Sequence, residues 1–178
     1  MINKWLEKTI IGLDLCPFAR RPYLEGKILI EELSGQESTE AQNQFLNALS
    51  SFQGQNQFET VLLIYPQWKI SFQDFYAFAE DCEEHLVSLN LEDEFQLVAF
   101  HPEFCFGGLD FSDRANLVNS SPLPLIHILR INDLDLLNLS AKDAEAMSFG
   151  NAKKLELLND EELLNHFPWR SNLKRQPF

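Results

Sequence analysis

The chain has 178 residues, enough for one domain with a hydrophobic core of its own, and its content of 45% apolar and 12% aromatic residues excludes a disordered polypeptide. Its 27 acidic and 14 basic residues give a formal net charge of -13, which would repel a phosphate backbone, so we expect no nucleic-acid partner. No run of 18 apolar residues occurs and charged residues interrupt the start MINKWLEKTIIGLDL, so we expect no membrane span or signal peptide and predict one soluble, cytoplasmic domain over residues 1–178.

Helices and strands are predicted to alternate along the first third of the chain. Apolar residues at helical spacing predict a first helix that begins at Ile2 and ends between Gly12 and Leu15. Residues 27–33 have the pattern of a short strand, and residues 58–66 have that of a strand buried on both faces. The helix between these strands has an apolar side that consists of Ala41, Phe45, Ala48, Leu49 and Phe52.

The same alternation continues to residue 100. Ser71, with Asp74 three positions later, predicts the start of a long helix, because a serine side chain can cap the exposed amide groups there. Residues 95–100 predict the third strand. We therefore expect an α/β fold, a layered single domain with a small, mostly parallel three-stranded sheet of β-α-β-α-β order and additional N- and C-terminal helices. A ferredoxin-like α+β arrangement is the alternative.

A long loop and further helices are predicted after the third strand. Residues 101–121 form the loop, and unstructured connections of about 20 residues in a compact domain usually carry function. The segment SPLPLIHILR, residues 121–130, predicts a helix with Ser121 as its N-cap and Pro122 at its first position. Shorter helices are predicted over residues 140–149, 151–158 and 160–166.

Cys16 is the first candidate for chemistry. It follows the first helix, and the neighbouring Arg20 and Arg21 would lower the pKa of its thiol. A thiol there could be a nucleophile, a soft metal ligand or an axial haem ligand, and the alternative is a small buried hydrophobic side chain. The three cysteines, at positions 16, 82 and 105, match no disulfide framework or zinc-knuckle spacing, and reduced thiols of a cytosolic protein are the simplest interpretation.

Two histidines lie where we expect a pocket. His101 directly follows the third strand, at the carboxyl edge of the sheet, where ligands of open α/β sheets bind. His127 and Arg130 would be one turn apart on the same face of the predicted helix, so the imidazole could exchange a proton while the guanidinium holds an anion. The alternative for His101 is that it only terminates the strand and forms a hydrogen bond with a neighbouring carbonyl group. The alternative for His127 and Arg130 is an ion pair with Asp110 or Asp113.

Short polar side chains precede the same predicted helix. Asn116, Asn119, Ser120 and Ser121 would lie near exposed amide groups, which attract anions at the start of a helix. Asp113 could accept a hydrogen bond from a histidine ligand or bind a metal itself. Capping of the helix would by itself explain the serine at position 121.

Four segments stand out in combination: GLDLCPFARRP, AFHPEFCF, the D-x-x-N spacing of Asp113 and Asn116, and NSSPLPLIHILR. In this order they resemble the bacterial family known as domain of unknown function 1415, and the likeness extends over roughly residues 1–135. The resemblance implies a soluble bacterial protein of this length and supplies no activity. Its motifs contain the candidate residues already named, which suggests that these residues share one pocket.

We predict an enzyme that acts on a small anionic molecule in a pocket at the carboxyl edge of the sheet. The expected catalytic residues are Cys16, His101 and His127, and the expected ligand-binding residues are Arg130, Asn116, Ser121 and Asp113. The three catalytic candidates are also the expected ligands if a metal is bound, with zinc or iron as the metal. The alternative is a non-enzymatic module that binds a small ligand, a protein or, as the weakest case, haem.

Overall fold

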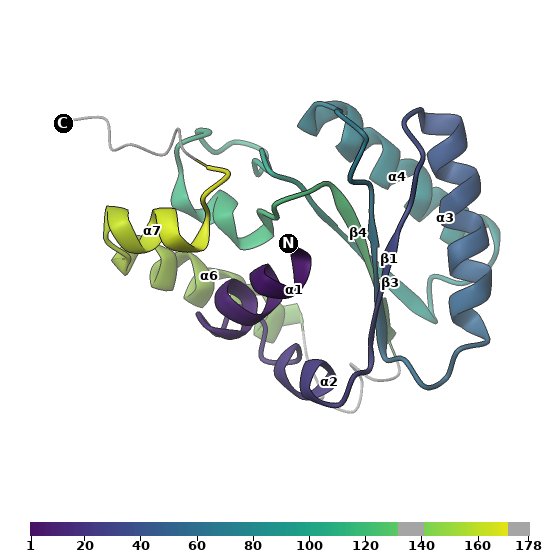
Figure 1. Ribbon diagram of the computed structural model, residues 1–178, viewed down its shortest axis with the longest axis horizontal. Coiled ribbons are helices and arrows are strands. Elements are labelled where there is room, and N and C mark those ends of the chain that lie inside the picture. The colour runs from purple at the N-terminus through teal and green to yellow at the C-terminus, as the bar shows by residue number, and fades with distance from the viewer. Residues whose placement is uncertain (132–140, 171–178) are drawn as a thin grey trace.

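One sheet forms the centre of the protein. The computed structural model describes residues 1–131 and 141–170, without the side chains of residues 141–148 (Figure 1). In this part of the chain four strands pair in the order β1-β2-β4-β3. They are β1 (Ile28–Glu32), β2 (Thr60–Ile64), β3 (Phe95–Phe100) and β4 (Leu125–Arg130).

The strand β4 lies between β2 and β3 and is antiparallel to both. Its His127 is opposite Leu62 on one side and Val98 on the other. β1 and β2 are parallel, with Ile28 opposite Thr60. Because β2 and β3 both run against β4, they point in the same direction without touching.

Two of our predictions about the sheet are wrong. The sheet has four strands instead of three, and among the described strands two of the three pairings are antiparallel instead of mostly parallel. The order of elements, β-α-β-α-β-β, also differs from the β-α-β-β-α-β order of the ferredoxin-like alternative. The helix predicted over residues 121–130 is instead the strand β4.

The physical reason for the error at β4 is burial on both faces. A strand covered on both sides has a continuous apolar sequence, and over so short a run its periodicity does not separate it from a buried helix. The β-branched Ile126 and Ile128 suit a strand, and the free edges of β2 and β3 both pair with it. Ser121 is therefore no helix N-cap, and its hydroxyl donates to the carbonyl oxygen of Leu123 at 2.5 Å.

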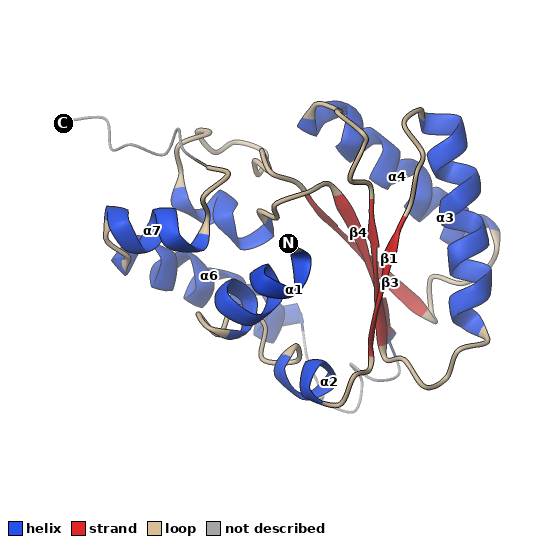
Figure 2. Cartoon of the chain, in the orientation of Figure 1, coloured by secondary structure: helices blue, strands red, loops and turns tan. Residues whose placement is uncertain are grey.

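Helices cover both faces of the sheet (Figures 1 and 2). The helices α3 (Ser38–Gln53) and α4 (Phe72–Ser88) lie against one face, on the right in both views. The other face carries α1 (Ile2–Trp5), the π-helical turn η1 (Leu6–Ile11), α2 (Arg20–Leu24), α6 (Ala141–Leu157) and α7 (Asp160–His166). A 3-10 helix, η2 (Arg114–Asn119), lies in the connection between β3 and β4.

Each face of the sheet has its own hydrophobic core, because successive side chains of a strand point to opposite faces. In β2, Val61 and Leu63 pack towards α3 and α4, whereas Leu62 and Ile64 pack towards the N-terminal segment. The predicted apolar side of α3 is confirmed, since all five of its residues are buried in the first of these cores.

Several other predicted elements are confirmed. The first helix corresponds to α1 and η1, and Ser71 caps α4 by accepting the amide hydrogen of Asp74 at 3.1 Å. The last predicted helix is α7, whereas the two helices predicted before it are one, α6. Within the described residues no helix is both long enough and apolar enough to cross a membrane.

Candidate functional site

A cavity of about 720 Å³ lies between the sheet and the N-terminal segment. Its floor consists of side chains from β2, β3 and β4, and α1, η1 and the segment from residue 15 to residue 22 form the opposite wall. Most of the lining is hydrocarbon, including Trp5, Leu6, Ile10, Leu62, Phe100 and Leu129. Cavities of this size and character are typical of small-molecule binding sites.

Cys16 lines this cavity at the point where the chain leaves η1. It begins a turn in which the amide of Ala19 donates to the carbonyl oxygen of Cys16 at 3.2 Å. Burial raises the pKa of the Cys16 thiol, while the backbone amides of Phe18 and Ala19 act in the opposite direction. At neutral pH the side chain is therefore a thiol and not a thiolate.

The two arginines that follow do not activate this cysteine, contrary to our prediction. Arg20 donates to the carbonyl oxygen of Ile11 at 3.3 Å, and Arg21 forms an ion pair with Glu59. Neither guanidinium contributes to the shift in the pKa of Cys16.

His127 lines the same cavity from the middle of the sheet. Its Nε2 lies 2.5 Å from Oγ1 of Thr60, which in turn lies 2.7 Å from the carbonyl oxygen of Ile128. Burial lowers the pKa of His127 to about 4, so the imidazole is neutral at physiological pH. The structure thus brings Cys16 and His127, which are distant in the sequence, to one cavity.

Sequence reasoning missed Thr60, the polar residue of an otherwise apolar strand. It also missed Asn151 of α6, which lines the cavity and donates through Nδ2 to the carbonyl oxygen of Leu15 at 2.6 Å. A polar side chain inside the apolar run TVLLI is the signal that could have identified Thr60, since a buried hydroxyl requires a partner. No comparable local signal marks Asn151.

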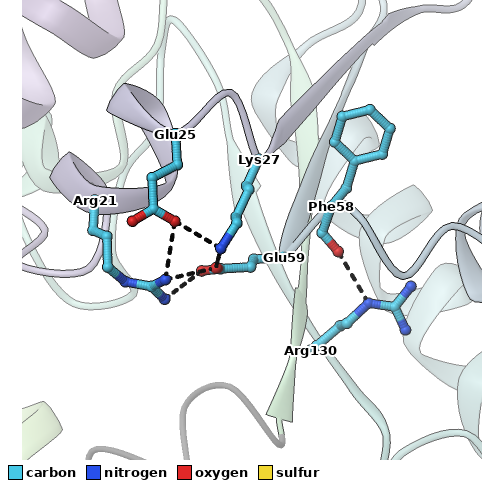
Figure 3. Close-up of polar contacts among 6 residues, drawn as sticks. All are labelled: Arg21, Glu25, Lys27, Phe58, Glu59 and Arg130. Atoms are coloured by element: carbon cyan, nitrogen blue, oxygen red, sulfur yellow. Dashed lines mark hydrogen bonds and ion pairs between the residues drawn. The ribbon is translucent and has the colours of Figure 1, made fainter.

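Two charged residues of the lining, Arg21 and Glu59, belong to a network of ion pairs (Figure 3). The carboxylate of Glu59 accepts from both terminal nitrogens of Arg21, at 2.8 and 2.6 Å. Lys27 lies 3.1 Å from Glu59 and 2.6 Å from Glu25, so two cations and two carboxylates balance each other. This network joins α2 to the start of β2.

Arg130 also borders the cavity, but its guanidinium is bonded to main-chain carbonyl groups at the end of α3 and before β2. Residues three apart in a strand point to opposite faces of the sheet, so the predicted shared face with His127 is wrong. The Nε of Arg130 donates to the carbonyl oxygen of Phe58 at 3.3 Å (Figure 3). One Nη donates to the carbonyl oxygen of Phe52 at 2.5 Å. The guanidinium also lies 4.3 Å from the ring centroid of Phe52.

His101 is outside the cavity lining and buried, with 3% of its surface exposed. Its Nδ1 accepts the amide hydrogen of Glu103 at 3.0 Å, and its ring packs beside those of Phe72 and Phe75. Burial is the main cause that lowers its pKa, to about 4. The structure does not bring this histidine together with Cys16 and His127.

The polar residues of the long loop contact the loop itself. Asp113 caps η2 by accepting the amide hydrogen of Ala115 at 2.9 Å. The side chain of Asn116 accepts from the amide of Phe106 and donates to the carbonyl oxygen of Asp110, both at 2.9 Å. These contacts, with that of Ser121 described above, hold the connection between β3 and β4 in place.

The expected metal ligands do not form one cluster. Across residues 1–131 and 141–170, no group of three or more histidine, cysteine, aspartate or glutamate side chains is arranged to hold a metal ion. Cys16 and His127 share the cavity, whereas His101, the third expected ligand, does not line it.

Comparisons with known proteins identify a family and no closer relative. The family described as "Protein of unknown function (DUF1415)" matches residues 1–165, which include every residue of the cavity lining. A search of curated proteins found no match, and a search of solved structures found none either.

Proposed function

We infer that this chain, which belongs to the DUF1415 family of proteins of unknown function, binds a small and largely apolar molecule in the cavity between its sheet and its N-terminal segment. The observation that carries this proposal is that Cys16 and His127, the two reactive side chains, open onto one cavity whose walls are mostly hydrocarbon. Such walls supply affinity by removing apolar surface from water, while a few polar groups orient the ligand.

Binding without chemistry is the function that the protonation states favour. The thiol of Cys16 has a raised pKa and the imidazole of His127 a lowered one, so transfer of a proton from sulfur to nitrogen is strongly uphill. A thiolate-imidazolium pair of the kind used by cysteine hydrolases therefore does not form in the resting site.

An enzyme with Cys16 as its nucleophile is the second candidate. It is favoured by the backbone amides of Phe18 and Ala19, which stabilise negative charge on the sulfur. An anionic substrate would then compete with Glu59 for Arg21, which borders the cavity, because the guanidinium of Arg130 is bonded to main-chain carbonyl groups.

Filling the cavity tests the binding proposal. Val98 lines the cavity, and a Val98→Trp variant should abolish the fluorescence gain of the neutral apolar probe N-phenyl-1-naphthylamine. The matched control is Val87→Trp on α4, where the side chain is 59% exposed and the probe signal should stay unchanged. Leu129→Trp fills the same cavity from β4 and should repeat the loss. Equal probe binding by all three folded variants and the unmodified protein would contradict the proposal.

Alkylation of Cys16 separates binding from catalysis. If the protein only binds, the rate of reaction of this thiol with iodoacetamide should stay low at pH 7 and rise in the alkaline range, because its pKa is raised. Rapid alkylation at pH 7 would instead favour the enzyme. Cys82, which is fully buried in the other core, is the internal control and should resist labelling in the folded protein at both pH values.

A further inference from the structure

The hydrogen bonds around Thr60 fix the position of a proton on His127. Oγ1 of Thr60 makes two short contacts, to Nε2 of His127 and to the carbonyl oxygen of Ile128, and each contact needs one hydrogen atom. The hydroxyl has one hydrogen and the carbonyl has none. The hydroxyl hydrogen therefore points to Ile128, and the second hydrogen belongs to Nε2 of the histidine.

The other ring nitrogen of His127 is left for a ligand. With Nε2 protonated and the ring neutral, Nδ1 has a lone pair and can only accept a hydrogen bond. Among the described residues this atom has no hydrogen-bond partner. Nδ1 of His127 is not among the fully buried polar atoms without a partner, whereas Nε2 of His101 is one of them. An unpaired acceptor is thus accessible in the wall of the cavity.

Other polar groups of the lining are acceptors as well. Asn151 and Asn119 each donate one Nδ2 hydrogen to a main-chain carbonyl oxygen, of Leu15 and Ala99, which leaves the amide oxygen as an acceptor and one further N–H group in each side chain. The carboxylate of Glu59 balances Arg21. The lining formally carries one net positive charge, on Arg130, whose guanidinium is already bonded to the main-chain carbonyl oxygens of Phe52 and Phe58.

We propose that the ligand is an uncharged molecule with an apolar body and a hydrogen-bond donor, a hydroxyl or N–H group, which donates to Nδ1 of His127. This inference rests on the proposed binding function and names the class of ligand. A carboxylate cannot satisfy Nδ1, because its oxygens would face the lone pair of the imidazole, whereas an alcohol supplies the missing hydrogen.

Matched ligands test the need for a donor. Displacement of N-phenyl-1-naphthylamine would be measured with 1-decanol, 1-methoxydecane and decanoate, which share an apolar chain and differ in the head group. We expect 1-decanol to bind roughly tenfold more tightly than the ether, the size of one hydrogen bond, and more tightly than decanoate. In a His127→Phe variant the preference of the alcohol over the ether should disappear. A His101→Phe variant, altered outside the cavity, should keep it.

A direct measurement of the proton position does not depend on any ligand. Nitrogen-15 NMR of the folded protein at pH 7 should show His127 as the neutral tautomer with its hydrogen on Nε2, with the signal assigned by its loss in His127→Phe. A hydrogen on Nδ1 would overturn the inference. Equal displacement by the alcohol and the ether, or stronger displacement by decanoate, would also overturn the inference. In either case, probe binding that is lost in Val98→Trp would still support the proposed binding function of the cavity. Failure of the probe to bind the unmodified protein would remove both.

Discussion

The hydroxyl of Thr60 on β2 connects His127 to the main chain of β4, because Oγ1 lies 2.5 Å from Nε2 of the imidazole and 2.7 Å from the carbonyl oxygen of Ile128. The two residues lie on neighbouring strands of one sheet, so the ring is held by its own strand and by the next one. The imidazole is thereby fixed in orientation before any ligand enters the cavity.

Removal of the Thr60 hydroxyl should destabilise the protein. In Thr60→Val the shape of the side chain is kept, while the Nε2–H group of His127 loses its acceptor, which costs about 1–3 kcal/mol for a buried polar group. The measurement is the free energy of unfolding in urea. Thr9→Val is a matched control, since Thr9 is also buried and donates to the carbonyl oxygen of His166 at 3.0 Å. The control should leave the NMR signals of His127 unchanged, whereas Thr60→Val should shift them.

The free energy of unfolding should fall as the pH drops from 6.5 to 4. A histidine has a pKa near 6.5 in the unfolded chain and His127 has one of about 4 in the folded protein, so between these values the unfolded chain binds a proton that the folded protein does not. The loss from this residue is on the order of 3 kcal/mol at pH 4, and above pH 6.5 its contribution is constant. A His127→Gln variant should lose less stability over this range. Parallel curves of the two proteins would contradict the prediction.

Arg130 should matter for stability and not for ligand binding. Its guanidinium donates to Phe52 and Phe58 and covers the ring of Phe52 at the end of α3, where main-chain carbonyls carry partial negative charge. An Arg130→Met variant, which keeps the length of the side chain, should lower the free energy of unfolding by about 1–3 kcal/mol. Its affinity for the neutral probe should equal that of the unmodified protein. A selective loss of probe binding would instead return this residue to the binding site.

The charged network beside the cavity should contribute little to stability. Arg21 and Lys27 are well exposed, with side chains 61% and 38% accessible, so water and salt screen their pairs with Glu59. We expect Glu59→Gln to lower the free energy of unfolding by less than about 1 kcal/mol at low salt, and by less again in 1 M NaCl. Urea titrations at the two salt concentrations measure this. A larger effect that salt does not reduce would indicate a buried role for the carboxylate.

Local patterns in the sequence were sufficient for the helices and strands that have one exposed face. The apolar side of α3, from Ala41 to Phe52, follows helical spacing because the other side of the helix meets solvent. The cap of α4 at Ser71 is likewise a local contact, with Asp74 three residues away. Such features depend on neighbours in the chain, and the sequence displays them directly.

The arrangement of the site depends on distant residues, and here the sequence was a weaker guide. It identified Cys16 and His127 as reactive side chains, but their common cavity requires the insertion of β4 between β2 and β3, which no local pattern encodes. The sequence around His127 predicts a helix, which puts Arg130 on the same face as this histidine, whereas in the strand β4 the two side chains point to opposite faces. The sequence does not point to Thr60, because the role of this residue lies in a contact with His127, which follows 67 residues later in the chain.

The position of β4 has a consequence for how the chain folds. The strand that completes the middle of the sheet is the last of the four to leave the ribosome, and until residues 125–130 emerge β2 and β3 have no partner for their facing edges. A nascent chain that ends before this point would expose the unpaired backbone edges of β2 and β3. Unpaired strand edges promote aggregation during synthesis. Completion of the sheet must therefore wait for a late, non-local docking step, which slows folding relative to a fold built from sequential hairpins.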